Sequence, residues 1–414
     1  MNGAGSEPPR LDVDRLIDDR RTRVIVCCGS GGVGKTTAAA AIGLRAAERG
    51  RHVVVLTVDP ARRLAQAMGL SSLDNTPRLV PGAGQAAGPG VSDNKENRQQ
   101  NDVSGGSLHA MMLDMKRTFD EIVEAHADPD RAAQILANPF YQSLSSSFAG
   151  TQEYMAMEKL GQLRRSEEWD LIVVDTPPSR SALDFLDAPQ RLGRFLDGRL
   201  LRMLAAPTKA GGRAYLRVLG AGLGMVTGVL TKILGAQVLR DAQTFVAALD
   251  TMFGGFRERA DYTYRLLRAP GTSFLVVAAP EPDALREASY FVERLAREGM
   301  PLAGMLLNRV HRQPPARTSA ASLSAARSVA AAETLHAADL MSGSPSGRYP
   351  LAAAALQLHA ERMTQAALER RVAEHFTAAH PLVPVTEVAA QPQDVHDLAG
   401  LRAIGASFSS VSSA

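Results

Sequence analysis

The octet "GSGGVGKT" at Gly29–Thr36 restricts the fold of this chain more than any other stretch does. It follows an apolar run at Thr22–Cys28 and opens a helical pattern at Lys35–Arg49, which Gly50 ends. A second apolar run, His52–Val58, comes directly afterwards. A strand, a glycine loop, a helix and a strand in this order predict a parallel βαβ unit whose loop binds phosphate.

The residue types in this loop are those that a phosphate site needs. Glycines let consecutive backbone N–H groups turn toward phosphate oxygens, and the N-terminus of the following helix adds partial positive charge. We expect Lys35 to reach the β- and γ-phosphates of a nucleotide and the Thr36 hydroxyl to bind Mg²⁺. The predicted nucleotide-binding residues of this segment are Gly29, Ser30, Gly31, Gly32, Val33, Gly34, Lys35, Thr36 and Thr37.

Two aspartates follow predicted strands and are expected to meet the loop at one edge of the sheet. Asp175 comes after the buried run Asp170–Val174, and Asp59 comes after the second apolar run. Ligands of open α/β sheets bind at the carboxyl ends of the strands. We expect Asp175 to hold Mg²⁺ through water and Asp59 to orient or deprotonate an attacking water. The alternatives are a helix N-cap at Asp175 and a turn residue before Pro60 at Asp59.

The remaining patterns predict an α/β P-loop NTPase fold, with a doubly wound, mainly parallel sheet and an inserted helical subdomain. One domain would span residues 1–414, and the segments of its sheet core would be about 20–80, 108–116, 169–189, 270–312 and 350–405. The Gly-, Asn- and Gln-rich stretch 81–107 has little to bury, which predicts a disordered insertion. Segments 117–165 and 190–268 are predicted to form the helical subdomain.

Further patterns continue toward the C-terminus. Leu108–Asp114 predicts a strand, and Thr272–Val310 predicts a strand, a helix and another strand. Pro314–Arg348, rich in Ala, Ser and Pro, predicts an insert with helical pieces. Leu356–Ala379 predicts an amphipathic helix, and His380–Val388 a last extended segment.

Composition argues against several classes of protein. A net charge of +3 is too small to imply a nucleic-acid partner. The two cysteines, Cys27 and Cys28, are neighbours on a predicted strand and face opposite sides, so we expect no disulfide, zinc site or iron–sulfur cluster. The first residues lack a signal-peptide pattern, and the longest uncharged apolar run, Val218–Thr231, is shorter than the roughly 20 residues that span a bilayer. We therefore expect a cytoplasmic protein that is at most peripheral at a membrane.

Three segments resemble the arsenite-pump ATPase family, which includes the ATPase that guides tail-anchored membrane proteins. "GSGGVGKTT", "TVDPARRLAQAMG" and "VVDTPPSRSALDFLDAPQRL" are similar to its phosphate loop, switch I and switch II. The phrases "FLDAPQRLGRFLDGRL" and "FVAALDTMFGGFRERA" extend the likeness to the actinobacterial anion-transporter-ATPase-like group. This family belongs to the deviant-Walker-A branch, with the partitioning and division-site ATPases. The resemblance implies a Mg²⁺-dependent ATPase that acts as a nucleotide-gated dimer.

The resemblance also implies roles for single residues. The nucleotide and metal contacts of the family fall on Lys35, Thr36, Thr37, Glu281, Asn308, Pro384 and Val385. Among these, Asn308 matches the asparagine that reads adenine, which implies ATP rather than GTP. Glu281 aligns with a nucleotide-contacting glutamate, and Pro384 and Val385 with the start of the loop that packs on the base. Asp59 falls on the switch I aspartate that positions the hydrolytic water.

Two departures from the family stand out. The Cys-x-x-Cys pair that clamps some dimers through zinc has no counterpart, and neither have the metalloid-binding cysteines, which argues against arsenite transport. Ser30 occupies the position at which this branch carries a lysine that reaches the phosphates of the partner subunit. Arg62 and Arg63 are candidates to replace that charge in a homodimer. The alternative, which we favour, is a heteromer with a paralog that carries the lysine.

Other functions remain open at the level of sequence. Arg213–Phe245 is apolar on more than one face, so it is either a groove for a membrane-protein client or a buried or dimer-contact helix. The first rival to an active ATPase is a low-turnover ATP-binding regulatory or scaffold subunit. The second is a partitioning or division-site ATPase, which the near-neutral charge and the long helical insertion disfavour.

Overall fold

The computed structural model describes residues 9–58, 62–84, 105–139, 141–142, 151–177, 258–311, 323–342 and 350–408. Several predictions fall outside these residues. They are the role of Asp59, the inner part of the insertion at 81–107, the switch II stretch from residue 178 on, the part 190–257 of the helical subdomain, which includes the apolar stretch Arg213–Phe245, and the two ends of the insert Pro314–Arg348. The side chains of Arg62 and Arg63 are also outside the described part of the chain.

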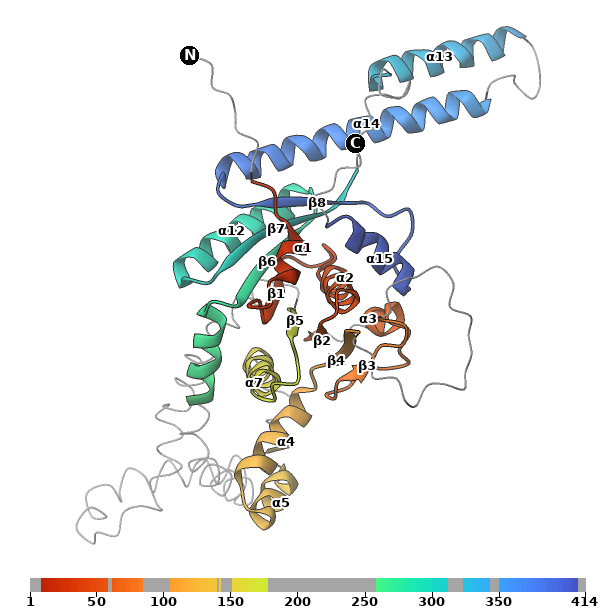
Figure 1. Ribbon diagram of the computed structural model, residues 1–414. Coiled ribbons are helices and arrows are strands. Elements are labelled where there is room, and N and C mark those ends of the chain that lie inside the picture. Colours follow the sequence, from red (N-terminus) through yellow and green to blue (C-terminus); the bar gives the residue numbers. More distant parts are fainter. Residues whose placement is uncertain are drawn as a thin grey trace, which may run out of the picture.

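Eight strands of the described residues form one sheet in the order β3-β4-β2-β5-β1-β6-β7-β8 (Figure 1). Every neighbouring pair is parallel except β3 with β4. The strands are β1 Val24–Cys28, β2 His52–Thr57, β3 Arg78–Leu79, β4 Ser107–Met112, β5 Leu171–Asp175, β6 Thr272–Ala278, β7 Leu302–Val310 and β8 Val385–Ala389. This confirms the doubly wound, mainly parallel sheet of the predicted P-loop fold.

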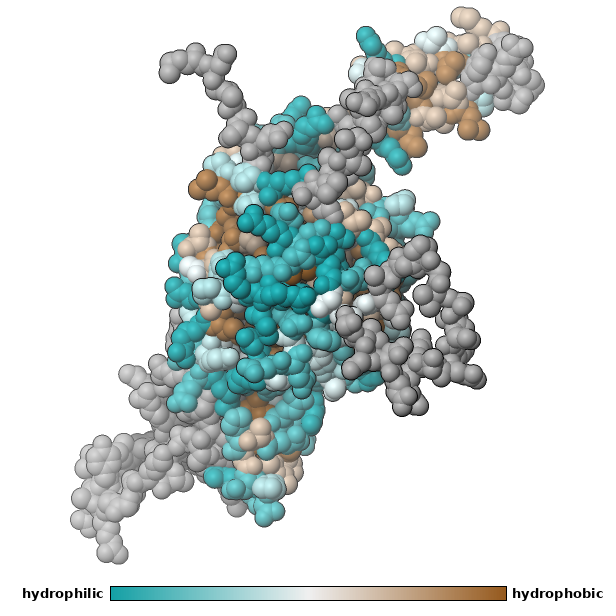
Figure 2. Space-filling model, viewed as in Figure 1, coloured by the Kyte–Doolittle hydropathy of each residue, from teal (hydrophilic) through white to brown (hydrophobic). Residues whose placement is uncertain are grey.

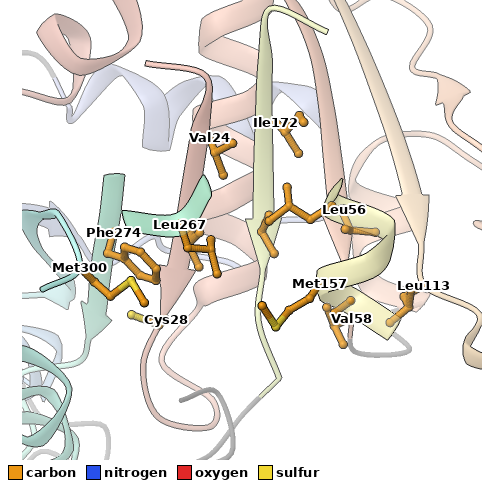
Figure 3. Close-up of a cluster of buried hydrophobic side chains, with 14 of the residues drawn as sticks. Val24, Cys28, Leu56, Val58, Leu113, Met157, Ile172, Leu267, Phe274 and Met300 are labelled. Atoms are coloured by element: carbon orange, nitrogen blue, oxygen red, sulfur yellow. The ribbon is translucent and has the colours of Figure 1, made fainter. Parts of the chain in front are cut away.

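The central strands are mostly apolar and buried, as expected of a parallel sheet whose two faces are both covered by helices. All five residues of β1 are buried, and its two cysteines point to opposite faces. Cys27 belongs to the apolar cluster beneath α2 (Lys35–Glu48), whereas Cys28 belongs to the cluster on the other face, with Phe274 and Met300 (Figure 3). The expected opposite orientation of the cysteines is therefore confirmed.

The helices divide between the two faces. The face that contains Cys27 packs against α1 Val13–Asp18, α2, α3 Arg62–Ala67 and α15 Leu398–Ala406. The face that contains Cys28 packs against α4 Met115–His126, α5 Pro129–Ala137, α7 Thr151–Arg165, the helical residues 258–268 and α12 Pro282–Glu298. In the second cluster, Met157 of α7 lies close to Val58 and Leu56 from the end of β2 (Figure 3).

A buried arginine fixes the amino-terminal edge of this sheet. The Arg51 guanidinium donates to the carbonyl oxygens of Ile17, Thr22 and Asp170, at 2.7, 2.5 and 2.6 Å. These carbonyls end α1 and precede β1 and β5, so one side chain joins three segments. Burial lowers the pKa of Arg51 to about 10, which still leaves it charged at neutral pH.

The ends of several elements differ from the predictions. The helix expected from Leu356 is α14, Pro350–Ala379, and it begins earlier because proline fits a first helical turn and the alanines that follow favour helix. Ser107, expected in the insertion, already pairs in β4. The short antiparallel strand β3 and the helix α1 were not predicted.

Helix α14 forms a hairpin with α13, Ala325–Ser342, that projects from the body of the sheet (Figure 1). Figure 2 shows hydrophobic surface on this hairpin, where Met341 and Leu351 are 89% and 85% exposed. Phe376, near the other end of α14, is buried against the sheet. Among the described residues, no helix is both long and apolar enough to cross a membrane.

Candidate nucleotide-binding site

The glycine loop lies where β1 ends and α2 begins, between β5 and β6 at the carboxyl edge of the sheet. At two of its glycines there is no room for a Cβ atom. A Cβ at Gly29 would lie 2.1 Å from the carbonyl oxygen of Val277 in β6. A Cβ at Gly34, which has a φ of +92°, would lie 2.3 Å from Nδ2 of Asn308. The loop therefore packs directly against residues of β6 and β7, and only glycine permits this approach.

Lys35 folds back over the loop. Its Nζ donates to the carbonyl oxygen of Ser30 at 2.7 Å, and the side chain is buried. The ammonium group is thus held across the mouth of the loop, while Gly31 and Gly32 at the tip are exposed. This arrangement places one positive charge and a set of backbone N–H groups where phosphate oxygens can bind.

Asp175 joins the loop to the neighbouring strands. Its carboxylate is fully buried, and Oδ2 accepts hydrogen bonds from the hydroxyls of Thr36 at 2.7 Å and Thr57 at 2.9 Å. Thr57 was not predicted as a site residue. The sequence feature that could have indicated it is a hydroxyl residue at the end of a predicted strand. In the structure, the parallel register of β2 and β5 pairs Thr57 with Asp175.

These oxygen atoms fit a magnesium ion. Mg²⁺ prefers hard oxygen ligands and keeps several waters, so one hydroxyl and one nearby carboxylate are a sufficient protein contribution. Thr36 and Asp175 supply that pair beside the phosphate loop. Within the described residues, no cluster of three or more His, Cys, Asp or Glu side chains is arranged to hold a metal ion.

Asn308 of β7 supports the loop from the other side. Its amide Nδ2 donates to the carbonyl oxygen of Val33 at 2.8 Å, and the residue is 9% exposed. The side chain expected to read adenine therefore contacts the phosphate loop itself.

An open cleft of about 950 Å³ surrounds these groups. Its walls come from the phosphate loop, α2, α3, the end of β7 and the segment after β8. The lining residues are Gly32, Gly34, Lys35, Thr36, Thr37, Ala40, Leu64, Gln66, Ala67, Thr176, Asn308, Arg309, His311, Ala389, Ala390, Gln391, Pro392, Gln393, Asp394, Val395, His396 and Ile404. A smaller charged cavity of about 550 Å³ lies elsewhere, among α4, α7 and the start of helix 258–268.

Of the four nucleotide contacts predicted outside residues 29–37, three do not line this cleft. Glu281 is exposed and forms the N-cap position of α12. Pro384 and Val385 lie at the amino end of β8, where the Pro384 carbonyl accepts from the amide of Met305 at 2.8 Å. Because β8 runs parallel to β7, its first residue is at the edge of the sheet opposite the phosphate loop. The loop of this region that lines the cleft instead follows β8, at Ala389–His396.

Helix α14 reaches the same site through a buried carboxylate that the sequence did not reveal. Glu369 accepts from the backbone N–H of His311 at 2.8 Å, lies 2.7 Å from its Nδ1 and accepts from Gln365 at 2.9 Å. His311 lines the cleft directly after β7. No motif links two residues that lie 58 positions apart, so only the fold brings them together.

Comparison with known proteins now identifies the family of the chain. Residues 22–351 match the model of a family described as anion-transporting ATPase, which covers most of the sequence. The chain belongs to this family. Its membership agrees with the resemblance in the three motifs and with the geometry of the phosphate loop.

Several relatives in the family carry ATPase names. The chain is 29% identical to an ATPase GET3 of Malassezia globosa over 46% of its own length and 49% of that protein. It is 27% identical to an ATPase ASNA1 homolog of Babesia bovis, over 49% and 51% of the two chains. With an ATPase ARSA2 of Chlamydomonas reinhardtii it shares 24% identity over 74% and 72%. The chain thus spans about half the length of the first two relatives.

Proposed function

We propose that this chain is a Mg²⁺-dependent ATP hydrolase that acts as a nucleotide-gated dimer and handles a membrane-protein client or a membrane partner. The observation that carries the proposal is the buried Asp175 carboxylate, held by Thr36 and Thr57 beside Lys35. Such a group next to a phosphate loop matches the metal and phosphate contacts of P-loop ATPases. The membership of the chain in a family of ATPases supports the same activity.

In this proposal each part of the site has a separate task. Lys35 and the backbone N–H groups of the loop bind the β- and γ-phosphates, and Thr37 adds a contact to the nucleotide. Thr36 and, through water, Asp175 would hold a magnesium ion, which would supply positive charge next to the phosphates. Asp59 orients the attacking water as general base. Asn308, which lines the cleft, is a proposed contact to the nucleoside.

The hydrolase proposal is tested with two variants that separate binding from chemistry. Lys35→Ala should abolish tight ATP binding, because the phosphates lose their only cation from the loop. Asp59→Asn should still bind ATP but hydrolyse it roughly 10²-fold more slowly, because it removes the base and leaves the phosphate contacts in place. Turnover should also disappear when Mg²⁺ is removed with a chelator. A wild-type chain that binds no ATP would contradict the proposal.

Ser30 leads us to propose a heteromer in preference to a homodimer. Its carbonyl holds Lys35, but a serine side chain is too short to reach the phosphates of a partner subunit. A charge supplied from a partner is worth on the order of 10³-fold or more in phosphoryl transfer. The purified chain should therefore turn over slowly, and Ser30→Lys should increase both turnover and ATP-dependent dimerisation. Vigorous turnover by a wild-type homodimer would exclude the requirement for a lysine-bearing paralog.

The second candidate function is a regulatory or scaffold subunit that binds ATP with negligible turnover, and Ser30 is the observation that favours it. Equal, poor rates in wild type and Asp59→Asn, together with strong ATP binding, would support this function. For the client-handling role, we propose that the helical subdomain predicted at 117–165 and 190–268 binds an apolar segment on the cytoplasmic side of a membrane. Purification from native cells, followed by identification of bound proteins, tests the paralog and the client together.

A further inference from the structure

Arg309, next to Asn308 in β7, has an unusual backbone conformation. Its φ is +62°, and within the described part of the chain only Glu167, with a φ of +57°, is another residue with a side chain in this region. A left-handed conformation is unfavourable for a residue with a Cβ and persists where the surrounding structure holds it. Arg309 also lies where the pairing of β7 with β8 shifts register, between Leu307 and Val310. The irregularity is typical of a β-bulge that redirects a side chain.

Two residues close to Arg309 in the chain, Asn308 before it and His311 two positions after it, are held by hydrogen bonds. Asn308 donates to the phosphate loop, and His311 is held by the buried carboxylate of Glu369. In a regular strand, neighbouring side chains point to opposite faces. Here Asn308 and Arg309 both line the cleft. The bulge thus turns the arginine toward the cleft, at a position with a left-handed backbone.

The Arg309 side chain is available for a ligand. The residue is exposed, and it makes no side-chain hydrogen bond or ion pair with any other residue that the structure describes. Lys35 and Arg309 are the lysine and arginine side chains among the lining residues. Lys35 is bound within the phosphate loop, whereas Arg309 precedes Val310, which pairs with Ala389 at the start of the cleft-lining segment after β8.

We propose that Arg309 is a nucleotide-binding residue whose guanidinium stacks on the purine base of ATP. This inference rests on the proposed nucleotide-binding function. It names a binding residue for the nucleoside, the part of ATP that the phosphate loop does not bind. A guanidinium is planar, weakly hydrated and always charged, so it can stack on an aromatic base as well as attract it. The bulge and the left-handed backbone present this plane to the nucleoside.

The test uses a substitution that removes the side chain and relaxes the backbone together. Glycine adopts a φ of about +60° without strain, so Arg309→Gly should melt no lower than the wild type. Its dissociation constant for Mg·ATP should nevertheless increase about tenfold, the effect of losing one stacked cation. Binding of Mg·tripolyphosphate, which has no nucleoside, should not change. Arg309→Lys, which keeps the charge but loses the plane, should also bind Mg·ATP more weakly than the wild type.

Glu167→Gly is the matched control. It relaxes the other left-handed backbone position, which is exposed and lies before β5, away from the cleft. This variant should bind Mg·ATP as the wild type does.

Each outcome of the titrations is decisive. If Arg309→Gly binds Mg·ATP as tightly as wild type, the inference is overturned and the proposed function stands. If it loses affinity for Mg·tripolyphosphate as well, Arg309 contacts phosphate and base stacking is overturned. If the wild-type chain binds neither ligand, the proposed function itself fails.

Discussion

Adding one methyl group at Gly34 should lower the free energy of unfolding of the protein even when no nucleotide is present. The φ of Gly34 is +92°, and a Cβ there would lie 2.3 Å from Nδ2 of Asn308. That nitrogen already donates to the carbonyl oxygen of Val33 at 2.8 Å. Gly34→Ala must therefore strain the backbone and also displace the amide that supports the loop.

The magnitude follows from these two effects. A left-handed conformation costs a residue with a Cβ about 1–2 kcal/mol. Breaking the Asn308 hydrogen bond and leaving its buried groups unpaired costs about 1–3 kcal/mol more. We expect Gly34→Ala to lower the free energy of unfolding by about 3 kcal/mol in total.

The neighbouring Gly32 provides a matched control. Its φ is +76°, but a Cβ there would have no other atom within 4 Å. Gly32→Ala should therefore cost only the backbone term, about 1 kcal/mol. Both variants are compared with the wild type by urea-induced unfolding, followed by circular dichroism in the absence of nucleotide.

A double-mutant cycle tests the assigned cause. Asn308→Ala removes the amide that the new methyl group would meet, so Gly34→Ala should cost less in that background than in the wild type. Equal losses for Gly32→Ala and Gly34→Ala would refute the reasoning. So would additive losses in the cycle, since they would show that the contact with Asn308 carries no energy.

Three further predictions concern buried groups. Arg51→Met leaves three carbonyls without their shared donor and should lower the free energy of unfolding by about 3 kcal/mol in urea titrations. Asp175→Asn should weaken Mg²⁺ binding to the nucleotide-bound protein about 10- to 100-fold in metal titrations, because the Thr36 hydroxyl loses its carboxylate neighbour. Burial raises the pKa of Cys28 to about 12 and raises that of Cys27 well above its ordinary value. A thiol reagent at pH 8 should therefore label neither cysteine until denaturant is added. Stability should fall as pH rises above the ordinary thiol pKa, because only the unfolded chain then ionises.

The sequence was most informative where the structure depends on local patterns. Helix α2 and strands β1, β2, β5, β6 and β7 lie within a few residues of their predicted positions, because apolar runs and helical periodicity are local properties. The position of Asp175 beside Thr36 followed from one topological rule, that parallel strands end at the same edge of the sheet.

The parts that could not be predicted depend on contacts between distant segments. Nothing near Glu369 in the sequence indicates that α14 would bring this carboxylate to the end of β7. The left-handed backbone of Arg309 coincides with a register shift between two strands, which apolar periodicity does not encode. The base-packing loop was expected from Pro384 because the family motif was aligned there, but the direction of β8 sends that residue to the opposite edge.

The geometry around Ser30 separates two tasks that a lysine at this position would combine. The backbone of Ser30 takes part in the local site, since its carbonyl accepts the hydrogen bond that holds Lys35 across the loop. A serine side chain leaves this bond intact, because residue 30 contributes only its main-chain carbonyl to it. The loop, Thr36 and Asp175 therefore keep what binding of phosphate and magnesium requires. What the serine removes is a charge that would act beyond the subunit. Substitution at Ser30 should therefore alter turnover and association far more than nucleotide affinity, whereas substitution at Lys35 should alter all three.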